Sequence, residues 1–236
     1  MHSKRYLRLD EQPQYYKVKF LKAKKSNHEI IIFVHGLFRS YRSMYLLARF
    51  FRKKAYDCYL FDYPSTKHML QKHIDGFSHF LNHCITQHPH EKIHIITHSM
   101  GGILLRGALN QLSTQHCQHI QSVVMLVPPN QGSPYASKIL TWLPKIKLLI
   151  KPLFDISHLP QAHVHTLKSV CHPNIGIIAA KYDKKAPSEL AHLPYQKDFM
   201  IINITHSLII DHPKTKKAIL NFIRFGRFLP QNNIFK

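Results

Sequence analysis

Glycine and cysteine are scarce in this sequence of 236 residues, which has 8 Gly and 4 Cys beside 14 Pro. So little glycine excludes a collagen-like or linker-dominated chain. The cysteines are Cys58, Cys84, Cys117 and Cys171, and no two of them form a CxxC pair. This spacing favours neither a disulfide framework nor a thiolate metal site, so we expect reduced, mostly structural thiols.

Long apolar runs are also missing. The uninterrupted apolar run at residues 30–34 is far shorter than the roughly 20 residues that a membrane-spanning helix needs. The amino terminus begins basic but turns acidic at Asp10 and Glu11, where a secretory signal would need apolar residues. We therefore expect no transmembrane segment, no cleavable signal and a cytoplasmic location.

Acidic residues are few: 12 Asp and Glu stand against 33 Lys and Arg, so the net charge is 33 − 12 = +21. Such a charge suggests nucleic acid as a partner, because Lys and Arg displace counterions from phosphates. The basic residues nevertheless form only small groups, without a tail-like block or an aromatic-basic recognition motif. Three such groups are Lys22, Lys24 and Lys25, then Lys145, Lys147 and Lys151, then Lys214, Lys216 and Lys217. We expect a solvated basic surface and no nucleic-acid binding, while peripheral contact with anionic lipid headgroups stays open.

The sequence is rich in apolar blocks that alternate with amphipathic stretches. With 44% hydrophobic residues it can bury a substantial core, and its length fits one domain over residues 1–236. Strands are predicted at 16–20, 29–34, 56–62, 93–97, 123–127, 175–180 and 199–204. Helices are predicted at 44–53, at 69–86, from the 98–102 region to 112, and at 213–225. Repeated strand-helix units predict an α/β fold with a mostly parallel central sheet and helices on both faces.

Residues 133–171 interrupt this alternation. Apolar residues are interleaved there with lysines, and prolines at 144, 152 and 160 divide the segment into short pieces. We predict a short insertion over the carboxyl edge of the sheet, where such folds bind their ligands. An ordinary covering helix and a mobile, lid-like apolar segment over an acyl pocket both fit the pattern.

The junction at Ser99 is the most informative position in the chain. A buried strand at 93–97 runs into a helix without any loop, and the tight turn this requires exposes the residue at its apex. The first N–H groups of a helix favour the negative charge that develops when a serine attacks a carbonyl. Gly101 lets the backbone pack closely, whereas Thr97 stands where a first glycine is usual. We expect His98 to point away from the pocket and to be a packing residue.

These residues resemble the lipase-like serine hydrolases of the α/β-hydrolase family. The matching pieces occur in the family's order and read FVHGL at 33–37, DYPST at 62–66, THSMGG at 97–102, VPPNQGS at 127–133 and THS at 205–207. The resemblance extends from about residue 30 to 225. Thr97 departs from the usual glycine, which bears on the geometry of the turn and not on the nucleophile.

The resemblance implies a serine, an acid and a histidine in that order along the chain. Four acids lie between Ser99 and the histidine expected at His206, namely Asp155, Asp183, Glu189 and Asp198. Asp183 fits best because it follows the strand at 175–180 and leaves room for one more strand. Asp155 belongs to the insertion, and Asp198 lies at the wrong end of the last strand.

The resemblance also implies a role for each residue. His206 would take the proton of Ser99, and Asp183 would hold the imidazole in the required tautomer. The backbone N–H groups of Leu37 and Met100 would form the oxyanion hole. The supporting loop would include His35, Gly36 and Gly101.

No metal or other cofactor is expected, because the many histidines show no recognised zinc spacing on a predicted element. Those that lie close together are His83, His88, His90 and His94, and then His116 and His119. We predict a cofactor-independent serine hydrolase that cleaves carboxylic esters, with lipid or other long-chain acyl substrates favoured by the insertion. An acyltransferase or thioesterase with the same three residues, or a noncatalytic protein that binds polyanions or membranes, stays an alternative.

Overall fold

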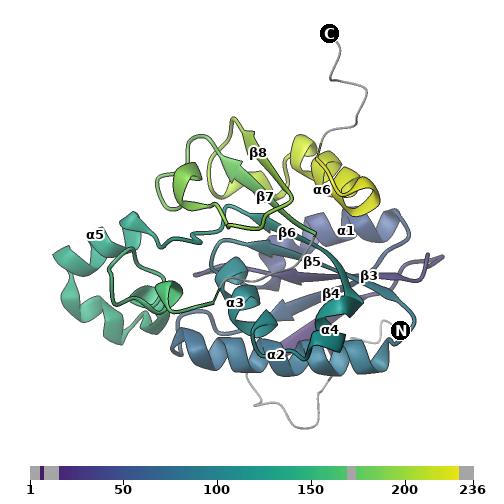
Figure 1. Ribbon diagram of the computed structural model, residues 1–236, viewed down its shortest axis with the longest axis horizontal. Coiled ribbons are helices and arrows are strands. Elements are labelled where there is room, and N and C mark those ends of the chain that lie inside the picture. The colour runs from purple at the N-terminus through teal and green to yellow at the C-terminus, as the bar shows by residue number, and fades with distance from the viewer. Residues whose placement is uncertain (1–5, 8–15, 169–173, 229–236) are drawn as a thin grey trace.

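The chain is built around one sheet in a computed structural model that describes residues 6–7, 16–168 and 174–228 (Figure 1). Within these residues the sheet has eight strands in the order β1-β2-β4-β3-β5-β6-β7-β8. The strands are β1 Tyr6–Leu7, β2 Lys17–Leu21, β3 Glu29–Val34, β4 Asp57–Asp62, β5 Lys92–His98, β6 Ile120–Leu126, β7 Ile175–Ala180 and β8 Asp198–Ile202. From β4 to β8 all neighbours are parallel, and β1 and β2 add an antiparallel edge. The predicted mostly parallel sheet is confirmed.

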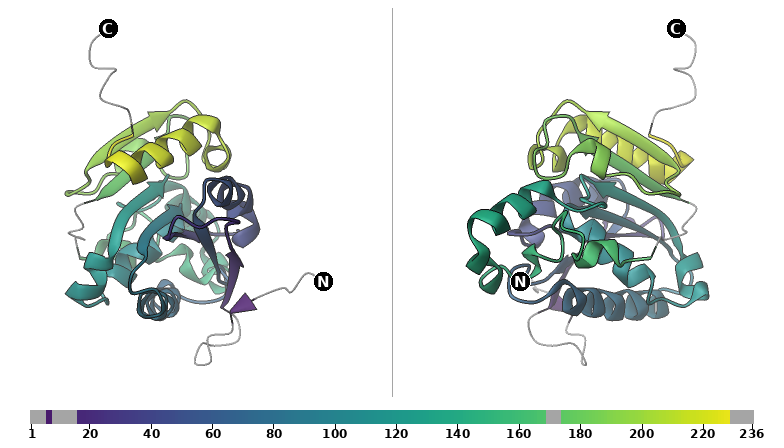
Figure 2. Two further views of the ribbon diagram at one scale, coloured as in Figure 1. Left: turned by 90° about the vertical axis from the view of Figure 1, so that its right-hand side faces the viewer. Right: turned by 60° about the vertical axis from the view of Figure 1, so that its left-hand side comes forward.

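Helices cover both faces of the sheet, as Figure 2 shows from two sides. The α-helices are α1 Tyr45–Lys53, α2 Leu70–Gln87, α3 Met100–Leu109, α4 Thr114–His119, α5 Pro134–Trp142 and α6 Pro213–Phe225. Short 3-10 helices are η1 Tyr41–Met44, η2 Pro144–Leu148, η3 Lys151–Leu153, η4 His163–His165, η5 Ser188–Leu190 and η6 Leu208–Ile210. Apolar residues of α2 and α3 pack on one face, and those of α1 and α6 on the other.

The central strand β3 explains why the sheet needs two covering layers. Ile30, Ile32 and Val34 belong to the core on the side of α2 and α3, whereas Ile31 and Phe33 belong to the opposite core. Successive side chains of a strand point to opposite faces, so an unbroken apolar run is buried only between two layers. The β-branched run that predicts this strand therefore also determines its central place.

The structure differs from the sequence prediction at the last strand and at one short helix. The last strand ends at Ile202, because the Ile204 N–H donates to the Ile202 carbonyl at 2.8 Å and turns the chain out of the sheet. Helix α4 was not predicted. It is six residues long and buries no side chain, so it has no apolar stripe, and Ser113 caps it by accepting from the His116 N–H.

The predicted insertion begins with α5 and continues through η2, η3 and η4. It forms a lobe at the left-hand end of the molecule in Figure 1, beside the carboxyl ends of the central strands. Residues 169–171 of the predicted range lie outside the described residues. The role of the segment as a lid stays a prediction.

Three of the four cysteines are free thiols, and Cys171 lies outside the described residues. Burial raises the pKa of Cys84 to about 12 and raises that of Cys58 as well. A raised pKa keeps these thiols protonated and unreactive, in line with a packing role. No helix in the described part of the chain is both long and apolar enough to cross a bilayer.

Phe61 of β4 lies at the centre of an aromatic cluster under α2. Its ring is 5.0 Å from that of Phe77 and 5.4 Å from that of Phe80, centre to centre, and it is fully buried. We expect Phe61→Ala to lower the free energy of unfolding in urea by about 3–5 kcal/mol, because it removes a large ring from a packed core. Phe225→Ala, at a ring that is 63% exposed, is the matched control and is expected to cost less than about 0.5 kcal/mol. Equal losses in the two variants would contradict this account of the core.

Candidate active site

Ser99 stands between β5 and α3 in a strained backbone conformation. Its φ is 53° and its ψ is −125°, in a region that residues other than glycine rarely occupy. Two hydrogen bonds hold it there: the Ser99 N–H donates to the Leu126 carbonyl, and the Gly102 N–H donates to the Ser99 carbonyl, each at 2.9 Å. The predicted sharp turn is present, and it leaves Ser99 partly exposed at the start of a helix.

Glycine is required at two positions around this turn. A Cβ on Gly101 would lie 2.7 Å from the carbonyl oxygens of Val34 and His35, which are backbone atoms at the end of β3. A Cβ on Gly36 would lie 2.8 Å from the Cβ of Ser99. The loop after β3 can therefore lie against the turn only because both residues lack a side chain. Thr97 is fully buried and does not prevent the turn.

Asp183 and His206 form a close pair at the carboxyl ends of β7 and β8. His206 Nδ1 lies 2.5 Å from Asp183 Oδ2, so the ring nitrogen donates to the carboxylate. The other oxygen, Oδ1, accepts from the backbone N–H groups of Lys185 at 2.8 Å and Ala186 at 3.0 Å. Both carboxylate oxygens are thus satisfied although the side chain is fully buried. With its proton on Nδ1, a neutral imidazole has its lone pair on Nε2.

The other three acids considered for this position lie elsewhere. Asp155 accepts at 2.8 Å from the N–H of Leu70, the first residue of α2. Asp198 accepts from the Phe228 N–H at 2.6 Å, at the amino end of β8. Glu189 is bonded to the hydroxyl of Ser188, its neighbour in the chain. Of these four acids only Asp183 contacts His206.

Ser99 and His206 line the same cavity of about 90 Å³. Its walls are mostly apolar, and α5 and the segments that follow it in the insertion supply a large share of them. The apolar lining residues include Leu37, Phe38, Pro129, Ala136, Ile139, Leu153 and Ile156. The Ser99 hydroxyl has no hydrogen bond to any described residue. The tertiary structure therefore brings the serine and the histidine to one apolar recess.

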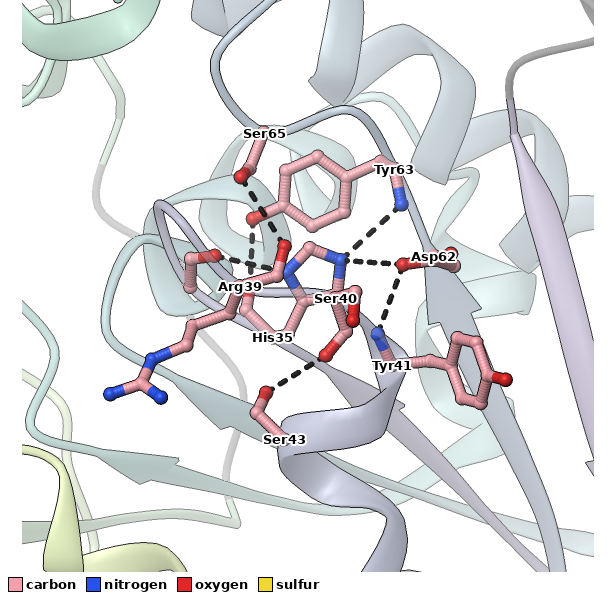
Figure 3. A network of polar contacts seen from close by, with 9 residues as sticks. His35, Arg39, Ser40, Tyr41, Ser43, Asp62, Tyr63 and Ser65 are labelled. Carbon is pink, nitrogen blue, oxygen red and sulfur yellow. Dashed lines mark hydrogen bonds and ion pairs between the residues drawn. The ribbon is translucent and has the colours of Figure 1, made fainter.

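A polar network fastens the loop after β3 to the end of β4 (Figure 3). His35 Nε2 lies 3.2 Å from Asp62 Oδ1, and that oxygen also accepts from the Tyr41 N–H at 2.9 Å. The Tyr63 hydroxyl donates to the His35 carbonyl at 2.8 Å, and the two rings stack with their centres 4.3 Å apart. The backbone between His35 and Tyr41 is fixed at both ends, with Leu37 between them.

Two backbone N–H groups near Ser99 are free to bind an oxyanion. The Leu37 N–H donates to no acceptor among the described residues. Met100 is the first residue of α3, and the first N–H groups of a helix have no partner within the helix. The partial positive charge of the helix start adds to their attraction for an anion.

His98 does not lie where the sequence predicted. It is almost fully buried, as expected of a packing residue, but it also lines the cavity, so the prediction that it points away is wrong. Its Nε2 donates to the His206 carbonyl at 3.0 Å, and the two rings lie 5.0 Å apart in an edge-on arrangement. Strand alternation cannot predict this contact, because the chain leaves the sheet at Ser99 and the loop that carries His206 returns over the strand end.

Sequence reasoning also missed Arg39, which lines the cavity. Its Nη2 donates to the hydroxyl of Ser207 at 2.8 Å, so it connects the loop after β3 with the loop that carries His206. The two residues are far apart in the chain, and no local pattern predicts their contact. The only available signal was the position of Arg39 close to the HGL motif.

A larger cavity of about 490 Å³ lies at the opposite, amino edge of the sheet. Ser122 and His94 line it, with 2.7 Å between Ser122 Oγ and His94 Nδ1, and Glu29 lies 3.4 Å from His94 Nε2. Ser122 is nevertheless only 4% exposed and lies within β6, with no helix start beside it. Exposure, backbone geometry and free N–H donors all favour Ser99 as the nucleophile, despite the smaller cavity there.

Four of the histidines that are close together in the sequence have separate protein partners, and that of His94 is described above. His88 contacts the Tyr59 hydroxyl, His116 contacts Asn82, and His119 contacts the Pro89 carbonyl. Over residues 6–7, 16–168 and 174–228, no three His, Cys, Asp or Glu side chains are placed to hold a metal ion.

Comparisons with known proteins give a family and a set of similar folds. Residues 14–140, more than half of the chain, match a family described as an alpha/beta hydrolase of unknown function. The mature form of the Bacillus licheniformis lipase BlEst2 is 17% identical with a TM-score of 0.68, and the alignment covers 92% of this chain and 99% of that one. Curated protein sequences give no match.

Two further solved structures are similar. Aspergillus fumigatus lipase B is 10% identical with a TM-score of 0.71, over 92% of this chain and 58% of that one. A monoacylglycerol lipase of Paleococcus ferrophilus is 15% identical with a TM-score of 0.60, over 87% of this chain and 98% of that one. At these identities the similarity shows the fold alone.

The buried position of His98 predicts how stability depends on pH. Burial, and then the neighbouring His206, lower the pKa of His98 to about 3, so it stays neutral in the folded protein. The unfolded chain binds a proton at this residue below a pH of about 6.5. The free energy of unfolding therefore decreases as the pH falls from there toward 3. His98→Gln, whose amide still donates a hydrogen bond, is expected to reduce this slope by up to about 1.4 kcal/mol per pH unit in urea unfolding. The free energies of unfolding at pH 8 serve as the baseline. An identical pH dependence in the wild type and in His98→Gln would show that a lowered pKa of His98 does not cause the slope.

Proposed function

The chain belongs to a family of α/β hydrolases of unknown function, and from that premise we propose that it is a serine hydrolase of carboxylic esters. The observation that carries the proposal is the Asp183–His206 pair, in which the imidazole lines the same cavity as Ser99. The pair fixes the proton of His206 on Nδ1. Nε2 is then left to accept the proton of a hydroxyl, which is the task of a general base.

We propose that Ser99 Oγ attacks the ester carbonyl while its proton moves to His206 Nε2. A bond forms between Oγ and the carbonyl carbon, and the carbonyl electron pair moves to the oxygen. The N–H groups of Leu37 and Met100 would donate to that oxyanion, each contributing about 3 kcal/mol of barrier lowering. Asp183 stabilises the imidazolium that forms, without itself taking the proton.

Collapse of this intermediate expels the alcohol, which takes the proton from His206 as it leaves. An acyl group stays on Ser99. Water then attacks the acyl carbon and gives its proton to His206, and the second intermediate releases the carboxylic acid and restores the Ser99 hydroxyl. Water and the ester supply every atom in this sequence, so no cofactor is required.

The apolar wall of the cavity favours an acyl group as the occupant, so we propose lipid or other long-chain esters as substrates. At about 90 Å³ the cavity is smaller than the roughly 300–1,000 Å³ of ordinary ligand sites. Because α5 forms part of the wall, a shift of the insertion is the simplest way to enlarge it. This is why we retain the lid as part of the proposal.

The cytoplasmic location also stays a prediction.

The nucleophile can be tested with a fluorescent fluorophosphonate, which labels an activated serine. We expect the chain to be labelled at Ser99 and to hydrolyse p-nitrophenyl esters, and we expect Ser99→Ala to lose both properties. Ser122→Ala is the matched control, because Ser122 also contacts a histidine and is expected to keep both. Labelling that persists in Ser99→Ala would contradict the assignment of Ser99 as the nucleophile. Ser122, at the amino edge of the sheet, would then be the next candidate.

The acid can be tested separately through the tautomer of His206. An Asn at 183 would present an amide donor to Nδ1 and favour the proton on Nε2, so we expect Asp183→Asn to reduce kcat by about 10⁴-fold. Asp198→Asn makes the same chemical change at the other end of β8 and is expected to leave kcat nearly unchanged in folded protein. A comparable loss in both variants would contradict a specific role for Asp183.

A further inference from the structure

The insertion exposes four large apolar side chains within residues 142–149. The exposed fractions are 73% for Trp142, 61% for Leu143, 69% for Leu148 and 74% for Leu149. We call these four residues the apolar tip. Exposed apolar side chains gathered in one short segment often mark an interaction surface, whereas single ones need no explanation.

The segment that carries the apolar tip is anchored to the rest of the protein. Ile146 and Ile150 of the same stretch pack against the core, and Leu140 of α5 is buried. The Lys151 N–H donates to the Thr66 carbonyl at 3.1 Å, which ties the start of η3 to the turn after β4. One side of the segment is therefore anchored, and its other side presents the apolar tip to solvent.

Lysines surround the apolar tip. Residues 134–154 contain Lys138, Lys145, Lys147 and Lys151 and no acidic residue. Lys138 Nζ lies 5.1 Å from the centre of the Trp142 ring, and none of these four lysines forms an ion pair with a described residue. An anionic bilayer presents phosphates for the lysines and acyl chains for the apolar tip, so it matches both halves of this surface.

The apolar tip adjoins the cavity of Ser99. Helix α5 contributes Tyr135 and Ile139 to the cavity wall, and Trp142 follows Ile139 by one helical turn. The lobe that carries it stands at one end of the molecule and comes forward in the right-hand view of Figure 2. A surface bound there would lie close to the cavity wall that α5 forms.

We propose that residues 142–149 dock the protein on the surface of an anionic lipid bilayer, from which the ester substrate reaches Ser99. The exposure of the apolar tip and the charge of the lysines around it support the docking. The conclusion that the substrate is a bilayer lipid rests on the proposed function. Binding and hydrolysis are therefore measured separately.

Trp142 is the only tryptophan of the chain, so its fluorescence reports on the apolar tip alone. We expect a blue shift when the intact protein is titrated with vesicles of phosphatidylglycerol and phosphatidylcholine in equal amounts, and none with phosphatidylcholine alone. Brominated acyl chains are expected to quench the emission, because the ring enters the region between headgroups and acyl chains. An unshifted emission maximum with the anionic vesicles would overturn the proposal.

Matched variants separate docking from general attraction between a basic protein and an anionic surface. In cosedimentation, Leu148→Ala/Leu149→Ala and Lys145→Glu/Lys147→Glu are each expected to weaken vesicle binding by about tenfold or more. Leu46→Ala/Phe225→Ala and Lys214→Glu/Lys217→Glu make equivalent changes on α1 and α6 and are expected to have much smaller effects. Equal weakening by a variant and its control would refute a localised surface. The proposal would also be refuted if the protein bound duplex DNA as tightly as the vesicles and the leucine variant bound both as tightly as the wild type.

Activity separates this proposal from the proposed function. The leucine variant is expected to hydrolyse a soluble short-chain p-nitrophenyl ester at the unchanged rate, but to release fatty acid from anionic vesicles about tenfold more slowly. Vesicle binding with the expected variant pattern but without hydrolysis of either ester would support docking and reject the hydrolase. Hydrolysis of the soluble ester without any Trp142 shift would support the hydrolase and reject docking.

Discussion

The close approach of two backbones, the end of β3 and the first turn of α3, is the constraint on which the rest of the site depends. Gly101 contacts the carbonyl oxygens of Val34 and His35 at a distance that excludes any side chain, and Gly36 does the same toward Ser99. Because the two carbonyl oxygens beside Gly101 belong to the backbone, they cannot move aside as a flexible side chain can. The contact lets the loop after β3 lie against the turn, so that Leu37 and Ser99 line the same cavity.

The scarcity of acidic residues makes the buried carboxylates informative. Asp183 is satisfied by two backbone N–H groups and His206, and Asp155 is satisfied by the start of α2. A carboxylate leaves water only where hydrogen bonds replace its hydration, so each buried acid has a defined partner. In a chain with an excess of 21 positive charges, Asp183 is the acid that a histidine of the site contacts.

The insertion contributes both to the wall of the cavity and to the exposed surface of the protein. Its inner residues, such as Ile139 and Leu153, line the cavity, while Trp142 and Leu149 face solvent among lysines. Short pieces separated by prolines can divide apolar residues between two sides in this way, whereas one long amphipathic helix would bury them on one face. The proposed substrate class and the proposed docking surface thus arise from one segment of about 20 residues.

The sequence by itself determined most of the elements and the position of the proposed nucleophile. Uninterrupted apolar runs predicted the buried parallel strands, and the strand-to-helix junction predicted an exposed Ser99, because both depend on neighbours in the chain. The sequence narrowed the acid to four residues and favoured Asp183, but only the tertiary structure decided that its carboxylate meets His206. Tertiary structure alone also placed His98 beside that imidazole, joined Arg39 to Ser207 and directed Trp142 outward. These contacts join segments that are distant in sequence, so their geometry is set by how the strand ends and loops pack together and not by any local periodicity.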